Sequence, residues 1–178
     1  MGCASFALAC LLAAAVAPTA TVGPASAAFA KPDPGTGDPI SPQYIPGTFR
    51  AEEAQLHDLT NRARRAAGCR EHLRADDALH KAARDHSRDM AAGDALSHEG
   101  YEGSSPPDRM ADAGYDTSAG WGENIAAGYD TPRAVMAAWL GSAPHRKNIL
   151  NCDFAALGVG IARAINGRLY WTQDFGGR

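Results

Sequence analysis

The chain lacks both a surplus of basic residues and an apolar run long enough to cross a bilayer. It has 17 Lys and Arg against 20 Asp and Glu, whereas a nucleic-acid-binding domain carries a basic excess. Its apolar run at residues 4–17 is shorter than the about 20 residues that a transmembrane helix needs. We therefore expect no nucleic-acid binding and no transmembrane segment. With 45% hydrophobic residues, the chain can still bury a core.

Motifs of several enzyme classes are missing as well. The sequence has no Gly-x-Ser-x-Gly elbow of the kind that presents a nucleophilic serine in hydrolases. Gly158-Val159-Gly160 lacks the third glycine and the following helix that hold a dinucleotide phosphate. Cys69 and Cys152 have no neighbouring cysteine, so they do not form a structural zinc motif. Residues that could carry chemistry lie in short segments between Ser97 and Phe175.

The N-terminal region has the composition of an export signal followed by a linker. The first 30 residues carry no charged side chain, and Ala25-Ser26-Ala27 follows the apolar run as a cleavage pattern. These features predict a secretory signal peptide at 1–27 and a secreted, extracellular protein. The usual basic residue before the run is missing, and lipid attachment at Cys10 remains an alternative. Five prolines and three glycines predict a linker at 28–48, before one folded domain at 49–178.

The cysteine count agrees with export. Cys3 and Cys10 would leave with the signal peptide, and two cysteines, Cys69 and Cys152, would remain. An even number of cysteines in an oxidising compartment favours one disulfide. The alternative is two buried free thiols.

Hydrophobic periodicity predicts an α+β fold. Helix one should bury Leu56, Leu59, Ala63 and Ala66, which recur at helical spacing. Helices are predicted at 50–67, from Asp76 or Asp77 to Gly93, from Pro106 to Gly114, and from Pro132 to before Pro144. Asn166-Gly167 between two β-prone runs, 157–165 and 168–175, predicts a β-hairpin, with another strand near 124–127. Helices should cover both faces of a small sheet.

Two of the six histidines and one glutamate are the candidate site residues. His98 and His145 are predicted in loops just beyond helices, where functional side chains concentrate, and Glu123 follows Gly122. Two imidazoles and a carboxylate could bind a divalent cation with an open position. The alternative is a hydrogen-bond network that fixes the loops. His86 falls on the apolar face of helix two and is interpreted as a core residue, whereas the remaining histidines, His57, His72 and His80, are predicted on the surface.

Nine segments in order resemble the CAP superfamily, which contains cysteine-rich secretory proteins, antigen 5 and pathogenesis-related proteins. The bacterial secreted branch is the most similar, and the resemblance covers residues 56–176. The segments are Asn61-Arg62-Ala63-Arg64 with Gly68, His86–Ala91, Ser97–Gly100, Gly114-Tyr115, Gly122–Ile125, Trp139, Ser142–Leu150, Gly158–Gly160 and Tyr170–Phe175.

This resemblance implies a three-layer α-β-α sandwich with a small antiparallel sheet and a cleft lined by two His and two Glu. His98, Glu123 and His145 match three of those positions. The fourth is Ser142, so one negative ligand is lost and cation binding should be weaker. Zinc is the favoured cation. Asn124, Ser142 and Asn148 are expected to orient the imidazoles by hydrogen bonds.

Three functions remain open from the sequence. The first is a monomeric extracellular module that binds a ligand such as a lipid, a sterol or a cell-wall component. The second is a metal-assisted hydrolase, in which Glu123 would serve either as a ligand or as a base. The third is a cell-surface interaction protein. Family membership does not separate these functions, because one fold can host several activities.

Overall fold

The computed structural model describes residues 44–45 and 48–178, so the predicted signal peptide and nearly all of the predicted linker lie outside the described residues. The elements follow in the order β1 (Tyr44–Ile45), α1 (Arg50–Ala66), β2 (Arg74–Ala75), α2 (Asp77–Gly93), the 3-10 turn η1 (Tyr101–Gly103), α3 (Pro106–Asp112), β3 (Trp121–Ala127), α4 (Pro132–Gly141), α5 (Ala143–Leu150), β4 (Phe154–Ala164) and β5 (Leu169–Gly177). Helices α1, α2 and α3 begin and end within a residue or two of their predicted positions. None of the helices in this described part is long and apolar enough to span a membrane.

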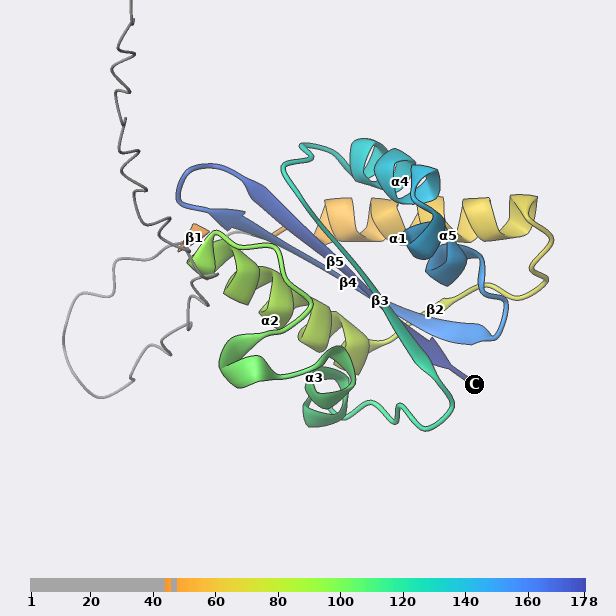
Figure 1. The fold of residues 1–178 in the computed structure, drawn as a ribbon. Helices are drawn as coiled ribbons and strands as arrows, with labels where there is room; N and C mark the ends of the chain where they lie inside the picture. Colours follow the sequence, from red (N-terminus) through yellow and green to blue (C-terminus); the bar gives the residue numbers. More distant parts are fainter. Residues whose placement is uncertain (1–43, 46–47) are drawn as a thin grey trace, which may run out of the picture.

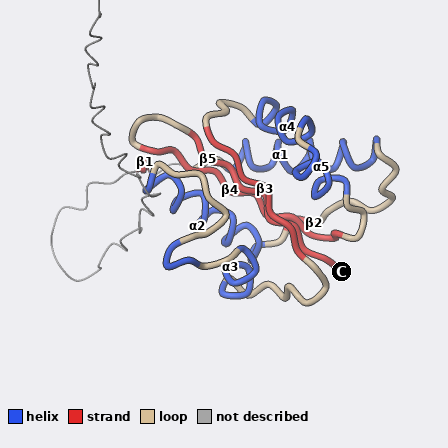
Figure 2. The backbone as a smooth tube through the Cα atoms, in the orientation of Figure 1, coloured by secondary structure: helices blue, strands red, loops and turns tan. Residues whose placement is uncertain are grey.

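The strands form one sheet with the order β1-β4-β5-β3, and β2 pairs beside β4. Helices α1, α4 and α5 cover one face of the sheet, and α2 and α3 cover the other (Figures 1 and 2). The predicted α+β class and three-layer sandwich are confirmed. The long strands pair antiparallel as expected, whereas the short β2 pairs parallel with β4, so the sheet is mixed.

Local sequence signals explain where two helices begin and where the hairpin turns. The Asp76 carboxylate accepts hydrogen bonds from the backbone N–H of Ala78 and of Leu79, both at 3.0 Å, and so caps α2. Ser105 and Asp108 form a capping box at α3. Gly167 has a φ of 89° in the turn between β4 and β5, which a glycine adopts without strain. The predicted hairpin is confirmed.

Strand β4 alternates large and small residues, and this alternation sets the spacing of the layers. Leu157, Val159 and Ile161 belong to the main core with α1, α4 and α5. The residues between them, Gly158 and Gly160, face α2. A Cβ atom on either glycine would lie 2.1–2.2 Å from the backbone of α2. The absence of side chains therefore lets α2 rest directly on the sheet.

Gly160→Ala is accordingly expected to lower the free energy of unfolding by about 1–3 kcal/mol, the usual cost of overpacking. The added methyl group would meet the backbone of Ala83, which cannot turn aside as a flexible side chain can. Gly141→Ala is the matched control, because a Cβ there meets nothing within 4 Å. Urea denaturation should separate the two variants. Equal stability of both would contradict the close packing of α2.

The buried face of α1 differs from the prediction. Leu56 is buried as expected, but Ala66 is exposed, and Arg64 is 1% exposed instead. The Arg64 guanidinium donates to three backbone carbonyls just beyond or near the end of α5, namely Ile149 at 3.0 Å, Asn151 at 2.6 Å and Phe154 at 3.0 Å. Because these carbonyls accept from both terminal nitrogens of the guanidinium, an arginine can be buried beside the predicted apolar stripe.

The prediction that His145 lies in a loop is wrong. Pro144 ends no helix here, because Ser142 closes α4 and the next helix, α5, starts at once with Pro144 in its first turn. Proline is tolerated in the first turn, where its missing N–H would have no partner within the helix. The histidine is therefore held on a short helix and not on a loop.

The predicted disulfide is present. Cys69 and Cys152 are bonded, with their Cα atoms 5.4 Å apart. The bond joins the segment after α1 to the segment after α5, and it excludes the alternative of two free thiols.

Candidate functional site

The candidate site is built on β3, which ends the sheet opposite β1. The outer carbonyls of this edge strand have side-chain partners. The carbonyl of Glu123 accepts from Asn148 Nδ2 at 3.0 Å, and the carbonyl of Ile125 accepts from Trp139 Nε1 at 3.1 Å. These bonds fasten α4 and α5 to the edge of the sheet and bring His145 beside β3.

Glu123 and His98 form the central pair of the site. The Oε1 atom of Glu123 lies 2.6 Å from Nδ1 of His98, and the Glu123 side chain is only 1% exposed. Because an ionised carboxylate can only accept, Nδ1 must donate the proton. With Nδ1 as the donor, the second ring nitrogen, Nε2, points away from Glu123 on a side chain that is 54% exposed. The structure thus presents one preoriented imidazole nitrogen to the outside.

Arg109 of α3 is the second partner of Glu123. Its Nη2 atom donates to Oε2 of Glu123 at 2.7 Å, and its Nη1 atom donates to the carbonyl of Ser104 at 2.6 Å. Burial by itself would raise the pKa of Glu123, but the hydrogen bonds from His98 and Arg109 and the positive charge of Arg109 outweigh it and hold that pKa below its ordinary value. Glu123 is therefore ionised at neutral pH.

His86 is a core residue, as predicted, and it also lies beside Glu123. It is fully buried on α2, and its Nε2 donates to the carbonyl of Ser97 at 2.9 Å. The same nitrogen lies 3.9 Å from Oε2 of Glu123. Burial lowers the pKa of His86 to about 4, so the ring is neutral at pH 7 and supports the Ser97-His98 segment without adding charge.

Asp174 is a further buried carboxyl group. It lies directly across from Glu123 in the pairing of β3 with β5 and is 1% exposed. Burial first, and the Glu123 carboxylate second, hold the pKa of Asp174 well above its ordinary value. Two neighbouring carboxyl groups cannot both ionise at low cost, so Glu123 ionises first and Asp174 holds its proton to a higher pH.

Asp174→Asn is therefore expected to raise the melting temperature at pH 7. A carboxyl group whose pKa is higher in the folded state takes up a proton on folding, so its contribution weakens the fold as pH rises above the unfolded value of about 3.9. Asparagine has nearly the same shape and carries no such cost. The gain should shrink toward zero as pH falls below that value. A melting temperature below that of the unaltered chain at pH 7 would contradict this expectation.

His145 approaches the site from α5, on the opposite face of the sheet from α2. It is partly buried, and burial first and the charge of His98 second lower its pKa. Asn124 donates to the carbonyl of His145 at 3.2 Å, and Asn148 bonds Asn124 at 3.0 Å. These asparagines hold the backbone of the helix. The Ser142 hydroxyl makes no capping bond to α5 within the described residues.

The residues fit a divalent cation in part. His98 Nε2 and the His145 ring are nitrogen donors of the kind that zinc binds. Both oxygens of Glu123 are already engaged, by His98 and by Arg109. Within residues 48–178 no three His, Cys, Asp or Glu side chains are grouped as a metal site. A cation here would have two imidazole ligands, with Glu123 orienting His98 from behind, an arrangement common at zinc-binding histidines.

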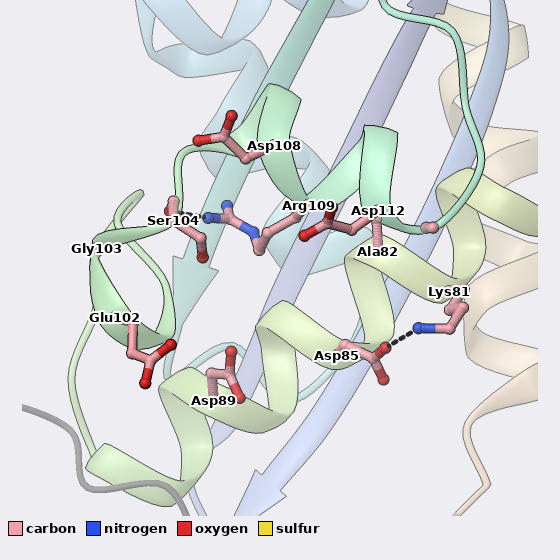
Figure 3. A pocket seen from close by; sticks show the side chains of 11 residues that line it. Lys81, Ala82, Asp85, Asp89, Glu102, Gly103, Ser104, Asp108, Arg109 and Asp112 are labelled. Carbon is pink, nitrogen blue, oxygen red and sulfur yellow. Dashed lines mark hydrogen bonds and ion pairs between the residues drawn. The ribbon is translucent and has the colours of Figure 1, made fainter.

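Arg109 also lines a pocket of about 510 Å³ between α2 and α3 (Figure 3). Asp85, Asp89 and Glu102 are among its acidic lining residues, and Lys81 pairs with Asp85 at 2.8 Å. Charged side chains thus dominate this pocket, and it is not an apolar groove of the type that encloses a lipid.

The structure places His98, Glu123 and His145 around β3, together with Arg109 and Asp174, which sequence reasoning missed. One signal was present. Asp174 is an acidic residue inside a strand whose residues 169–176 are all buried. Arg109 gave no comparable signal, since an arginine on a short helix is usually exposed.

Comparisons with known proteins agree with this architecture. The profile of the CAP family, described as the cysteine-rich secretory protein family, matches residues 57–175. YkwD of Bacillus subtilis (strain 168), an uncharacterized protein, is 37% identical over 133 residues, which are 75% of this chain and 50% of that protein. The chain therefore spans about half the length of that relative.

Two solved structures are similar in fold. An extracellular protein containing an SCP domain from Bacillus anthracis str. Ames is 30% identical, with a TM-score of 0.65 over 75% of this chain and 45% of that one. An outer surface protein from Borrelia burgdorferi is 22% identical, with a TM-score of 0.67 over 76% of this chain and 98% of that one. The profile covers more than half of the sequence, and the chain belongs to the CAP family of cysteine-rich secretory proteins.

Proposed function

We propose that this chain is an extracellular binding module whose cleft at the edge of β3 takes a polar component of the cell wall. The observation that carries the proposal is the His98–Glu123 pair. A buried carboxylate fixes the ring through Nδ1 at 2.6 Å and leaves Nε2 available on an exposed side chain. A few polar groups held in place in this way are what gives a binding site its specificity.

The surroundings favour a polar ligand over a lipid or a sterol. The pocket next to Arg109 is lined mainly by charged side chains. Trp121, two residues before Glu123, is 43% exposed and offers one flat apolar surface near the cleft. An isolated indole beside polar groups suits a ligand with both hydroxyl or amide groups and small apolar faces, such as a cell-wall glycan.

Export agrees with the family and with the disulfide. CAP proteins are named for secretion, and one similar solved structure is an extracellular protein. A disulfide such as Cys69–Cys152 persists in oxidising compartments. We include in the proposal a signal peptide at 1–27 and one divalent cation, zinc first, held by His98 and His145. Burial and the charge of His98 lower the pKa of His145, which keeps that ring neutral and able to bind a metal at neutral pH.

Sedimentation with purified peptidoglycan sacculi tests the proposed ligand. The unaltered chain should sediment with sacculi, and His98→Ala and His145→Ala should each reduce the bound fraction at least fivefold. His72→Ala is the matched control, because His72 is exposed and bonds only Arg65 among the described contacts. Vesicles of phosphatidylcholine with and without cholesterol form the second arm. Sedimentation with vesicles alone, or equal binding by His98→Ala, would contradict the proposal.

A hydrolase is the second candidate, and the same pair favours it. A histidine oriented by a carboxylate through one nitrogen can remove a proton through the other. Glu123 itself is too buried and too well bonded to act as the base, so His98 takes that role. Time-dependent release of soluble fragments from sacculi, abolished in His98→Ala, would support hydrolysis. Binding without release would leave the binding module alone.

A further inference from the structure

We propose that Arg109 is a built-in cation of this cleft. Its guanidinium holds the Glu123 carboxylate where a bound metal ion would otherwise hold it, and it confines any added divalent cation to His98 and His145. The inference refines the proposed cation site and depends on it only for the two imidazoles.

Both oxygens of the Glu123 carboxylate already have hydrogen-bond donors. Glu123 accepts from Arg109 at 2.7 Å through Oε2 and from His98 at 2.6 Å through Oε1. A zinc–carboxylate bond of about 2.0–2.2 Å would require one of these oxygens to give up its donor. Displacing Arg109 would leave a guanidinium that is only 9% exposed without its acidic partner. An unpaired buried charge is strongly unfavourable, so the metal has no easy access to Glu123.

Arg109 is also held in place by a second hydrogen bond. Its Nη1 atom donates to the carbonyl of Ser104 at 2.6 Å, so the guanidinium is fixed at two points. The capping box of Ser105 and Asp108 starts α3 immediately afterwards and sets the position of the helix that carries Arg109. Figure 3 shows the side chain reaching from α3 toward Ser104. The positive group is therefore in place before any ligand arrives.

The charges of Arg109 and Glu123 also decide how the site interacts with a cation. Glu123 and Arg109 form a buried ion pair, with Nη2 of Arg109 2.7 Å from Oε2 of Glu123, and their charges cancel each other. This pair thus offers a dication no net negative charge, and the fixed guanidinium repels it. Two imidazoles alone should bind zinc weakly, and the residue that sets this limit is Arg109.

Calorimetric zinc titration of Arg109 variants tests the inference. Arg109→Met removes the charge and keeps an unbranched side chain of similar length, and it should bind zinc at least tenfold more tightly than the unaltered chain. Arg109→Gln should also gain affinity, and it can still donate one hydrogen bond to Glu123, which helps the variant fold. Arg109→Lys keeps the charge and should gain nothing. Arg62→Met, at an exposed position of α1, is the control for arginine removal.

The gain must also depend on Glu123. Adding Glu123→Gln to Arg109→Gln should return the zinc affinity to that of the unaltered chain. Equal zinc affinity in the unaltered chain, Arg109→Met and Arg109→Gln would overturn the inference, and so would undetectable binding in all three. Neither result bears on sedimentation with sacculi, so failure here is distinct from failure of the proposed ligand.

Discussion

Replacing Cys69 by serine is expected to lower the free energy of unfolding by about 4–5 kcal/mol. The Cys69–Cys152 bond closes 83 positions of sequence, and a crosslink over so long a loop removes much of the entropy of the unfolded chain. It also joins the two segments where Arg64 bonds the carbonyls near the end of α5. Loss of the bond should therefore loosen the layer that carries His145.

Denaturation in guanidinium chloride measures this effect, with both cysteines replaced in a second variant so that no free thiol remains. Cys69→Ser and the double variant should agree with each other and with the unaltered chain after reduction. If the oxidised chain and the double variant had the same unfolding midpoint, the bond would contribute nothing to stability.

The sequence carried most of the information about individual elements because their signals are local. Asp76 caps α2 through its own neighbours, and Asn166-Gly167 turns the hairpin. Helix α1 was different, since Arg64 is buried only because α5 ends beside it and supplies carbonyls. That partner comes 85 residues later in the chain, and no local pattern shows it.

The residues of the site also fall into two groups, those with a local sequence signal and those that depend on long-range packing. His98, Glu123 and His145 were chosen as candidates because histidine and glutamate near glycine and helix ends are unusual by themselves. Asp174 required the register of β3 against β5, which places it across from Glu123. Arg109 required the packing of α3, which turns an otherwise ordinary helical arginine toward a buried carboxylate. Register and packing are long-range properties, so these contacts could not be predicted from residue spacing.

Glu123→Ala should produce the other large effect, a loss of about 3–5 kcal/mol in the free energy of unfolding. The substitution removes the acceptor of both His98 and Arg109 and leaves the guanidinium buried without its acidic partner. Buried charges stripped of their partner cost far more than exposed ones, because water cannot replace the lost interaction. The same change should free the His98 ring and abolish its fixed orientation.

Glu53→Ala is the matched control for this effect. Glu53 is equally buried and also bonds an arginine, Arg84, at 2.9 Å through Nε. The Arg84 side chain is 32% exposed, whereas that of Arg109 is 9% exposed, so Arg84 can recover water when its partner is removed. Thermal melts at pH 7 should therefore show a clearly larger loss for Glu123→Ala than for Glu53→Ala. Equal losses would mean that burial of the guanidinium does not decide the energetic cost of removing its partner, and the position of Arg109 beside Glu123 would have no special energetic importance.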